Sequence, residues 1–475
     1  MSLAAKIAKN TVYQIAGKGV GMLLGLATIA LMTRYLGQKG FGYYTIIVSY
    51  LQFFGVLIDF GLQMTTAQLL ARPGVNQSKV FGNLLAVRLL SAFIFIGLGS
   101  LLVWFFPYPL EVKIGAGITA FSFFFISLQS VLIGLYQKHM AMAEVAMAEV
   151  WGRLVLLIGV WLTVAGDWGF YPIMAAISLS SLTNFAVLYF KSQNYVRYRL
   201  DWDKKILKEI WDVSWPLAIT ISLTLVYFRA DTIILSLVRP VEEVGIYGAA
   251  YKVLEILVQF PYMFLGLLLP IFSESFLINR GLFNKVLQKA FDFLAIMVMP
   301  MVFGCLVLAE KIMTLVAGEA FAVAGGPLRI LIFAIMLIYF GALFGYAIVA
   351  AGQQKKMIGF YLFDAVFSLA AYLLFIPPFG YWAAAILTVM TELIITVCAF
   401  WLIRKSAGFH LRLGVMVKAV LASLLMSLVI LVMINQSVVT LIIIGAMVYF
   451  AFLYLLKGYN AEDLKEMAGL KKVTG

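Results

Sequence analysis

Five basic side chains lie inside long apolar runs of this 475-residue sequence, namely Lys18, Arg88, Arg153, Arg229 and Lys252. An ionisable group within a membrane segment costs at least about 2.5–3.5 kcal/mol, so it usually faces a hydrated cavity or a partner of opposite charge. The chemistry open to these cations is therefore to hold an anionic group in a cavity or to pair with a carboxylate.

Four carboxylates share the apolar runs, namely Asp231, Glu255, Asp364 and Glu392. A carboxylate near mid-membrane without a local cation, such as Glu392, is a candidate site for H⁺ or Na⁺. The alternative is a protonated or hydrogen-bonded glutamate between helices. Asp231 is expected either to pair structurally or to couple transport to an ion, and no other cofactor or metal is expected.

The spacing of two pairs lets these charges neutralise one another. Glu149 and Arg153 are four residues apart, and Lys252 and Glu255 are three apart. Both spacings place the side chains on one face of a helix, where a salt bridge can form. The cationic and anionic members of these pairs are thus candidates for structural ion pairs as well as for cavity groups.

Three other charged positions need partners from elsewhere in the fold. Arg229 and Asp231 are two residues apart and do not share a helix face. Lys18 follows the first of three glycines at 17, 21 and 25, which allow close helix packing. It either faces the cavity or extends to the cytoplasmic interface, whereas Arg88 lies deeper, about 12 Å inside its segment.

The sequence offers no set of residues for catalysis. Cys305 and Cys398 each lie inside an apolar run and indicate neither a disulfide framework nor a metal site. No phosphate-cradling loop with the Gly-Lys-Ser/Thr ending occurs, and no Ser/His/Asp set is evident. The longest exterior loop, about 310–327, is too small for a polymerase or ligase domain. The chain is therefore predicted not to be an enzyme.

These residues must be positioned by membrane helices, because 64% of the chain is hydrophobic and only 12% is charged. The apolar residues form runs of about 20, the length that crosses the hydrocarbon core. Pro261 and Pro300 fall in such runs and either free carbonyls at a cavity or mark packing kinks. Fourteen segments are predicted: 12–33, 42–64, 80–106, 112–136, 145–165, 170–190, 212–237, 245–272, 288–309, 328–350, 357–376, 381–403, 413–434 and 437–456.

The distribution of Lys and Arg orients these segments. With a cytoplasmic N-terminus, one side of the membrane carries 22 of these residues and the other side 4. Because basic residues collect in cytoplasmic loops, both termini are predicted to be cytoplasmic. The net charge of +13 is explained in the same way, without a nucleic-acid partner.

An internal repeat divides the first twelve segments into six and six. At an offset of 203 residues, Gly42 aligns with Gly245 and Tyr44 with Tyr247. An even number of spans per half gives a parallel repeat, in which substrate binds between the halves. The predicted organisation is an N-terminal lobe 1–190, a basic linker 191–211, a C-terminal lobe 212–403, appended helices 404–456 and a tail 457–475.

Several strings resemble the Wzx-type polysaccharide flippases of the multidrug/oligosaccharidyl-lipid/polysaccharide (MOP) exporter superfamily. They are Thr33–Gly37, Gly40–Tyr44, Asp59–Leu62, Arg229–Leu235, Val244–Tyr247 and Ala249–Lys252. Many such relatives have twelve spans rather than fourteen, which brings lipid II flippases into consideration.

The resemblance implies transport of an undecaprenyl-pyrophosphate-linked oligosaccharide across a bacterial or archaeal cytoplasmic membrane by alternating access. The intramembrane cations would then bind pyrophosphate. It also implies a monomer in the lipid bilayer that works beside a polysaccharide polymerase and other assembly proteins, for O-antigen, capsule or exopolysaccharide. The alternatives are an ion-coupled multidrug antiporter of the MATE type, a lipid II flippase, and a membrane-embedded polymerase or ligase.

Overall fold

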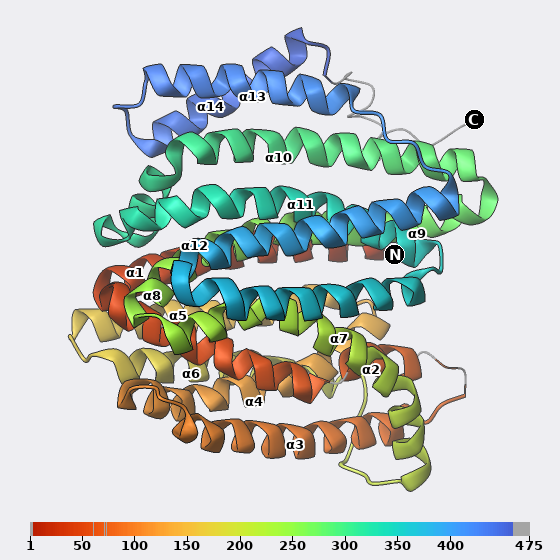
Figure 1. The fold of residues 1–475 in the computed structure, drawn as a ribbon. Helices are drawn as coiled ribbons and strands as arrows, with labels where there is room; N and C mark the ends of the chain where they lie inside the picture. Colours follow the sequence, from red (N-terminus) through yellow and green to blue (C-terminus); the bar gives the residue numbers. More distant parts are fainter. Residues whose placement is uncertain (1–2, 60, 71, 73, 459–475) are drawn as a thin grey trace. The chain divides into compact units, whose positions relative to one another are not determined.

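The computed structural model describes residues 3–59, 61–70, 72 and 74–458, and every regular element in them is helical (Figure 1). The α-helices are α1 (Leu3–Asp59), α2 (Leu62–Leu70), α3 (Gln77–Leu102), α4 (Leu110–Lys138), α5 (Met142–Ala165), α6 (Phe170–Ser192), α7 (Lys204–Val238), α8 (Val241–Leu257), α9 (Gln259–Ile278), α10 (Arg280–Ala317), α11 (Gly325–Ala350), α12 (Ile358–Ala407), α13 (Gly414–Val432) and α14 (Val438–Leu455). Short 3₁₀ segments are η1 (Val103–Phe105), η2 (Glu319–Ala324) and η3 (Gln354–Met357). The prediction of an all-α protein is confirmed, and the predicted tail beyond residue 458 lies outside the described residues.

Eleven helical stretches of the described chain are long and apolar enough to cross a membrane, so this is a multi-pass membrane protein. Two of them each contain two predicted segments, because α1 departs from helical geometry only at Gly37 and α12 only at Gly380. Both glycines have positive φ, 64° and 57°, a conformation that glycine adopts without strain. The number of crossings and the side of the termini stay predictions.

The helices group into two compact units. Unit 1 comprises residues 1–248, 316–320 and 369–380, and unit 2 comprises 249–315, 321–368 and 381–475. Unit 1 thus runs past the predicted lobe end at 190, through α7 and into α8. The predicted lobes and linker remain a prediction about the repeat.

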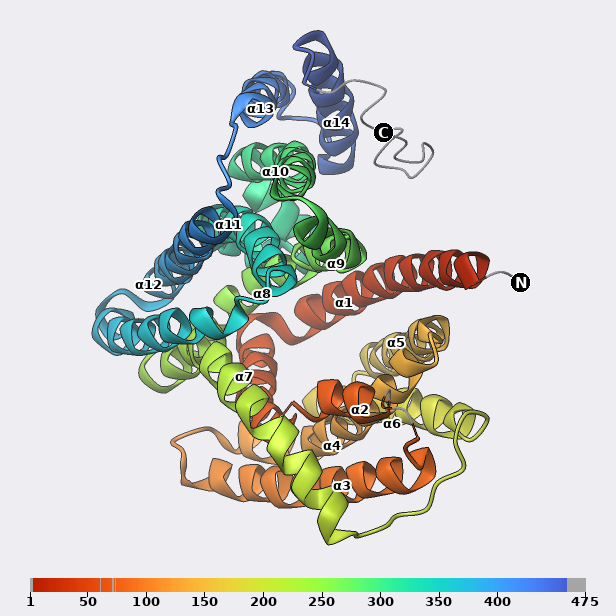
Figure 2. The same cartoon turned by 90° about the vertical axis from the view of Figure 1, so that its right-hand side faces the viewer.

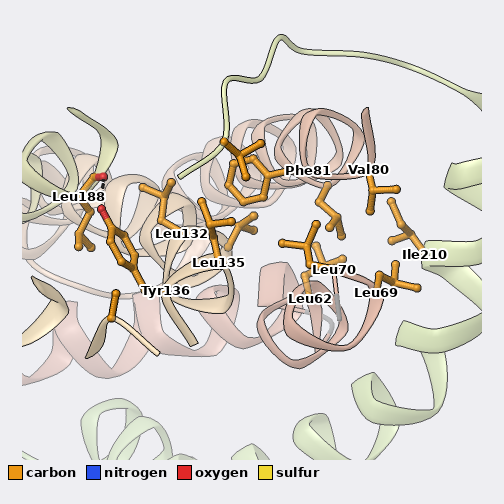
Figure 3. Close-up of a cluster of buried hydrophobic side chains, with 14 of the residues drawn as sticks. Leu62, Leu69, Leu70, Val80, Phe81, Leu132, Leu135, Tyr136, Leu188 and Ile210 are labelled. Atoms are coloured by element: carbon orange, nitrogen blue, oxygen red, sulfur yellow. Dashed lines mark hydrogen bonds between the residues drawn. The ribbon is translucent and has the colours of Figure 1, made fainter. Parts of the chain in front are cut away.

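A buried apolar cluster joins α2, α3, α4, α6 and α7 at one end of unit 1 (Figure 3). Its labelled members are Leu62, Leu69, Leu70, Val80, Phe81, Leu132, Leu135, Tyr136, Leu188 and Ile210. The Tyr136 hydroxyl donates a hydrogen bond of 2.8 Å to the Leu188 carbonyl, which satisfies a polar group inside the cluster. The loop 193–203 is held against this end, since the rings of Phe81 and Tyr198 pack edge to face at 4.6 Å.

The second arm of α1 and the start of α8 cross through glycines within unit 1. A Cβ on Gly42 would lie 2.2 Å from the carbonyl oxygen of Val241. A Cβ on Gly245 would lie 2.1 Å from the carbonyl oxygen of Gln38. Because Gln38 and Val241 are also 203 residues apart, each contact is the repeat equivalent of the other. Only glycine permits such an approach of two backbones.

A third contact lies at the centre of the same crossing. Thr45 and Gly248 are equivalent positions of the repeat, and a Cβ on Gly248 would lie 2.4 Å from the Thr45 hydroxyl oxygen. Positions that align in the predicted repeat therefore contact one another at this crossing.

In unit 2, Pro300 lies inside α10 and cannot donate to the carbonyl of Ile296, four residues earlier. The hydroxyl of Tyr449 on α14 donates to that carbonyl at 2.8 Å, and the tyrosine is fully buried. This bond attaches the appended pair α13–α14, which lies beside α10 (Figure 2).

A similar arrangement occurs where α8 meets α9. Pro261, in the first turn of α9, has no N–H to donate to the carbonyl of Leu257, the last residue of α8. The buried Tyr339 hydroxyl of α11 donates to that carbonyl at 3.2 Å. Of the two readings offered for these prolines, the structure favours packing kinks, because a buried tyrosine satisfies each freed carbonyl.

Candidate functional site

Arg88 of α3 is buried to 1% exposure and is held by groups from α1 and α4. Its Nη1 donates to the Ile58 carbonyl at 2.5 Å, and its Nη2 pairs with Asp59 and donates to the Ser130 hydroxyl. In the described chain its Nε finds no acceptor. Both terminal nitrogens of this buried guanidinium are engaged by protein groups, one of them a carboxylate, so these contacts favour a structural role. Its predicted role as a cavity cation stays untested.

Arg153 of α5 lies against the glycine stripe of α1. A Cβ on Gly25 would lie 2.5 Å from its Nη1, and one on Gly21 would lie 3.2 Å from its Nε. The same guanidinium pairs with Glu149 at 2.8 Å, which confirms the salt bridge expected from the four-residue spacing. The glycines therefore make room for a charged side chain between two helices.

Lys18 is half-buried on α1, next to Gly17, whose absent Cβ would lie 2.8 Å from the Cβ of Ala146. One residue along a helix is a turn of about 100°, so Lys18 points away from the stripe that packs on α5. Within the described part of the chain, Lys18 takes part in no hydrogen bond or ion pair. Its charge is thus available to a ligand or to water.

Asp231 of α7 is buried to 1% exposure inside unit 1. Its carboxylate accepts from the Tyr247 hydroxyl at 2.5 Å and from the backbone N–H of Thr232 at 2.5 Å. Arg229 lies near enough for its charge to act on this carboxylate. Tyr247 belongs to the second Gly-x-Tyr of the predicted repeat. This motif therefore supplies a hydrogen-bond donor to a buried carboxylate, which the alignment alone does not reveal.

Lys252 and Glu255 of α8 form an ion pair at 2.7 Å in unit 2, as their three-residue spacing predicts. Both side chains are largely buried, with 19% and 23% exposed. Each makes further interactions as well, so neither is an isolated charge. Their predicted roles as a pyrophosphate cation and a coupling carboxylate stay untested.

Asp364 and Glu392, on the two arms of α12, form an acidic pair in unit 2. Asp364 is 0% exposed and Glu392 is 8% exposed. Neither oxygen of Asp364 has a hydrogen-bond donor in the described chain. Asp364 lies near enough for its charge to act on Glu392, and Glu392 lies near enough to act on the hydroxyls of Tyr262 and Tyr361. In an apolar setting, at least one of two neighbouring carboxyls keeps its proton unless a cation binds beside them.

The two phenols beside Glu392 were not among the predicted site residues. Tyr262 lies on α9 and Tyr361 on α12, about 130 and 30 residues from Glu392 in sequence. Aromatic residues make up 15% of the chain, and no spacing distinguishes these two from the others. The acidic pair and the two phenols together present oxygen atoms of the kind that hard cations prefer. Among the described residues, no three His, Cys, Asp or Glu side chains are placed to hold a metal ion.

Residues 7–276, more than half of the chain, match a family model described as "Polysaccharide biosynthesis protein". No curated protein sequence matches the chain. Among solved structures, it is similar to the lipid II flippase MurJ in an inward closed conformation, with a TM-score of 0.77, 16% identity, and 94% of this chain and 98% of that chain covered.

Transporters of the MOP superfamily share the fold as well. An inward-facing multidrug resistance MATE family transporter has a TM-score of 0.69 and 14% identity, covering 84% of this chain and 98% of its own. A transporter from Pyrococcus furiosus described as having a binding pocket of reverse polarity has a TM-score of 0.60 and 15% identity, with 85% and 95% covered. The resemblance noted in the sequence is confirmed: the chain has the fold of these transporters and belongs to the family of polysaccharide biosynthesis proteins.

Proposed function

We propose that this protein is a flippase that moves undecaprenyl-pyrophosphate-linked oligosaccharide across the cytoplasmic membrane, for the synthesis of a surface polysaccharide. The proposal rests on one combination of features. The chain belongs to a polysaccharide biosynthesis family, consists of membrane helices and has the fold of the lipid II flippase MurJ. A pyrophosphate and a glycan can cross hydrocarbon only in a hydrated cavity, and alternating access supplies one. A monomer, with a polymerase as its downstream partner, completes the proposal.

Lys18 is the side chain that we assign to the pyrophosphate. It is the candidate cation whose charge no described carboxylate or carbonyl engages, whereas Arg88, Arg153 and Lys252 each have an acidic partner. A lysine ammonium binds phosphate as a point charge and needs no fixed geometry, which suits a ligand that must also leave.

We assign ion coupling to Asp364 and Glu392. These two carboxyls must hold a proton or a cation while they are buried, and they can release it when they are hydrated. An ion gradient can therefore shift the equilibrium between the two conformations. The support for this assignment is the burial of both groups and the absence of donors to Asp364 in the described chain. H⁺ and Na⁺ are the candidate ions.

The test is a flipping assay in proteoliposomes with a fluorescent lipid-pyrophosphate oligosaccharide. Wild type is expected to move the lipid, and Lys18→Ala is expected to lower the initial rate by about ten-fold or more, the value of one charge-assisted contact. Lys138→Ala is the matched control, because Lys138 is also half-buried and has no ion pair in the described chain. Equal rates for the two variants would remove Lys18 from the site.

The second candidate function is ion-coupled export of organic cations, which the MATE-like fold and the buried acidic pair both favour. The same vesicles distinguish it. Transport of a cationic dye that depends on Glu392, without movement of any lipid-linked sugar, would establish the antiporter and refute the flippase. Movement of lipid II alone would place the protein with the lipid II flippases.

A further inference from the structure

A basic pocket of about 590 Å³ lies where the loop 193–203 passes the first turn of α3. Lys79, Arg197 and Arg199 line it together with one carboxylate, Asp201. Lys79 is paired with Asp203 at 2.5 Å, which leaves the two arginines as its available charges. Both arginines are exposed, and neither has an ion pair in the described chain. The pocket therefore presents two guanidinium groups against a single carboxylate.

The backbone that carries these arginines is fixed to α3. The Ser78 hydroxyl donates to the Arg197 carbonyl at 2.6 Å, and the Asp203 N–H donates to the Asn83 side chain at 2.6 Å. Gly82 admits the Arg199 carbonyl, since a Cβ there would lie 2.1 Å from its oxygen. The backbone positions of both arginines are therefore fixed relative to α3.

An apolar groove between α3 and α4 begins at the edge of the basic pocket. Leu200 lines both, and Trp202 lies beside it at the mouth of the groove. Farther along, Phe93 and Phe124 connect this mouth to a second hollow that contains Gly97 and Gly117. Figure 1 shows α3 and α4 running side by side along this length.

The dimensions of the groove correspond to one leaflet. From Ala86 to Gly97 the helix advances about 16 Å at 1.5 Å per residue, close to half of a hydrocarbon core of about 30 Å. Phe93 is 75% exposed and Trp202 is 55% exposed, so the walls are apolar and open. A Cβ on Gly97 or Gly117 would meet no atom within 4 Å, which makes these glycines the floor of an unfilled space.

We propose that a phospholipid with an anionic headgroup binds here, its phosphate between Arg197 and Arg199 and one acyl chain along the α3–α4 groove. Charge complementarity selects the headgroup, because basic residues at the predicted cytoplasmic surface attract anionic lipids. The continuous apolar path selects a lipid over a free phosphate. The site is independent of the transport assignment, since it uses none of the residues assigned to the cargo or to the coupling ion.

The headgroup half of the proposal is tested by native mass spectrometry of the full chain in detergent, titrated with phosphatidylglycerol and, separately, phosphatidylcholine. Arg197→Gln/Arg199→Gln is expected to weaken phosphatidylglycerol binding about 25-fold, at roughly five-fold per arginine. Lys204→Gln/Lys205→Gln removes the same charge from the next residues of the chain, both exposed and outside the pocket, and is expected to change it less than two-fold.

The apolar groove is tested by Gly97→Leu, which adds a side chain at a position of the hollow where a Cβ meets no atom within 4 Å. It is expected to weaken both lipids several-fold while the melting temperature stays at the wild-type value. Leu98→Phe is the control, because Leu98 is 44% exposed on the same helix but does not line the groove.

Three results would overturn the assignment. The first is an equal loss of binding in the two double variants, which would mean that the loop acts only through its net charge. The second is glycerol phosphate binding as tightly as phosphatidylglycerol, which would make the ligand a free phosphate. The third is a preference of the same groove for undecaprenyl phosphate, which would place the tail of the cargo there instead.

Discussion

Gly42 and Gly245 meet back to back where α1 crosses α8, with the Cβ position of Gly245 only 3.1 Å from the backbone nitrogen of Gly42. The two residues align with each other in the predicted 203-residue repeat. Each admits a backbone carbonyl from the other half of the repeat, Val241 for one and Gln38 for the other. The crossing is therefore closed by backbone contacts that leave no room for a side chain.

Gly245→Ala is expected to disrupt this crossing. The new methyl group would lie 2.1 Å from the Gln38 carbonyl oxygen, and a backbone atom cannot move aside cheaply. Overpacking of this kind typically costs about 1–3 kcal/mol. We expect a lower melting temperature and greater labelling of a cysteine introduced at position 45, which the closed crossing buries.

Gly19→Ala is the control for this change, because a Cβ there meets no atom within 4 Å on the first arm of α1. It is expected to leave the melting temperature unchanged or slightly raised, since alanine favours the helix. A Gly245→Ala protein as stable and as poorly labelled as Gly19→Ala would contradict the reciprocal packing described above.

Tyr449→Phe is expected to loosen the appended helix pair. It removes the hydroxyl that donates to the Ile296 carbonyl, which Pro300 has already deprived of its usual helical donor. A buried acceptor left unsatisfied costs about 1–3 kcal/mol. The measurement is the apparent melting temperature in detergent.

A double-mutant cycle with Pro300→Ala separates this effect from simple loss of packing. Alanine restores an N–H to α10, so Tyr449→Phe should cost less in the Pro300→Ala background than in wild type. Equal costs in both backgrounds would show that the hydroxyl does not serve the freed carbonyl.

Asp59→Ala is expected to be among the most damaging single changes in unit 1. It leaves the buried guanidinium of Arg88 without its carboxylate partner. Removing one partner of a buried ion pair costs about 3–5 kcal/mol. Glu149→Gln, in the pair whose side chains are 31% and 33% exposed, is expected to cost only about 0–1 kcal/mol. Comparable melting temperatures for the two variants would mean that the Arg88 charge is hydrated.

The sequence predicts those parts of the structure that depend on short spacing. Runs of about 20 apolar residues mark the ends of α14 to within one residue and those of α5 to within three. Spacings of three and four residues give both intrahelical ion pairs. It does not predict α2 as a separate helix, because the predicted segment 42–64 runs past Gly61, whose positive φ precedes α2. Nor does it show that α1 continues past Gly37 after a single non-helical residue.

The remaining features depend on residues far apart in the chain. The partner of Arg88 is 29 positions away, and the tyrosine that serves Pro300 is 149 away, so no periodicity reveals either. The repeat aligns Gly42 with Gly245, but that alignment does not show that the two lie in contact. The Asp364–Glu392 pair is similar, since each carboxylate can be named from the sequence while their proximity comes from the turn at Gly380.

Asp203 at the start of α7 gives a pH dependence whose direction is fixed by its partners. The hydrogen bond from Lys79, and then that from the backbone N–H of Lys205, lower the pKa of its carboxyl group. Because the folded pKa lies below the unfolded value of about 3.9, the stabilisation is complete above that pH. It is lost as the pH falls through the folded pKa.

Asp203→Asn should therefore lower the melting temperature by a constant amount between about pH 5 and 8, and by progressively less below about pH 4. A difference that changes between pH 5 and 8 would contradict this assignment, and a Lys79→Met background should abolish most of the effect, because the partner that contributes most is then absent.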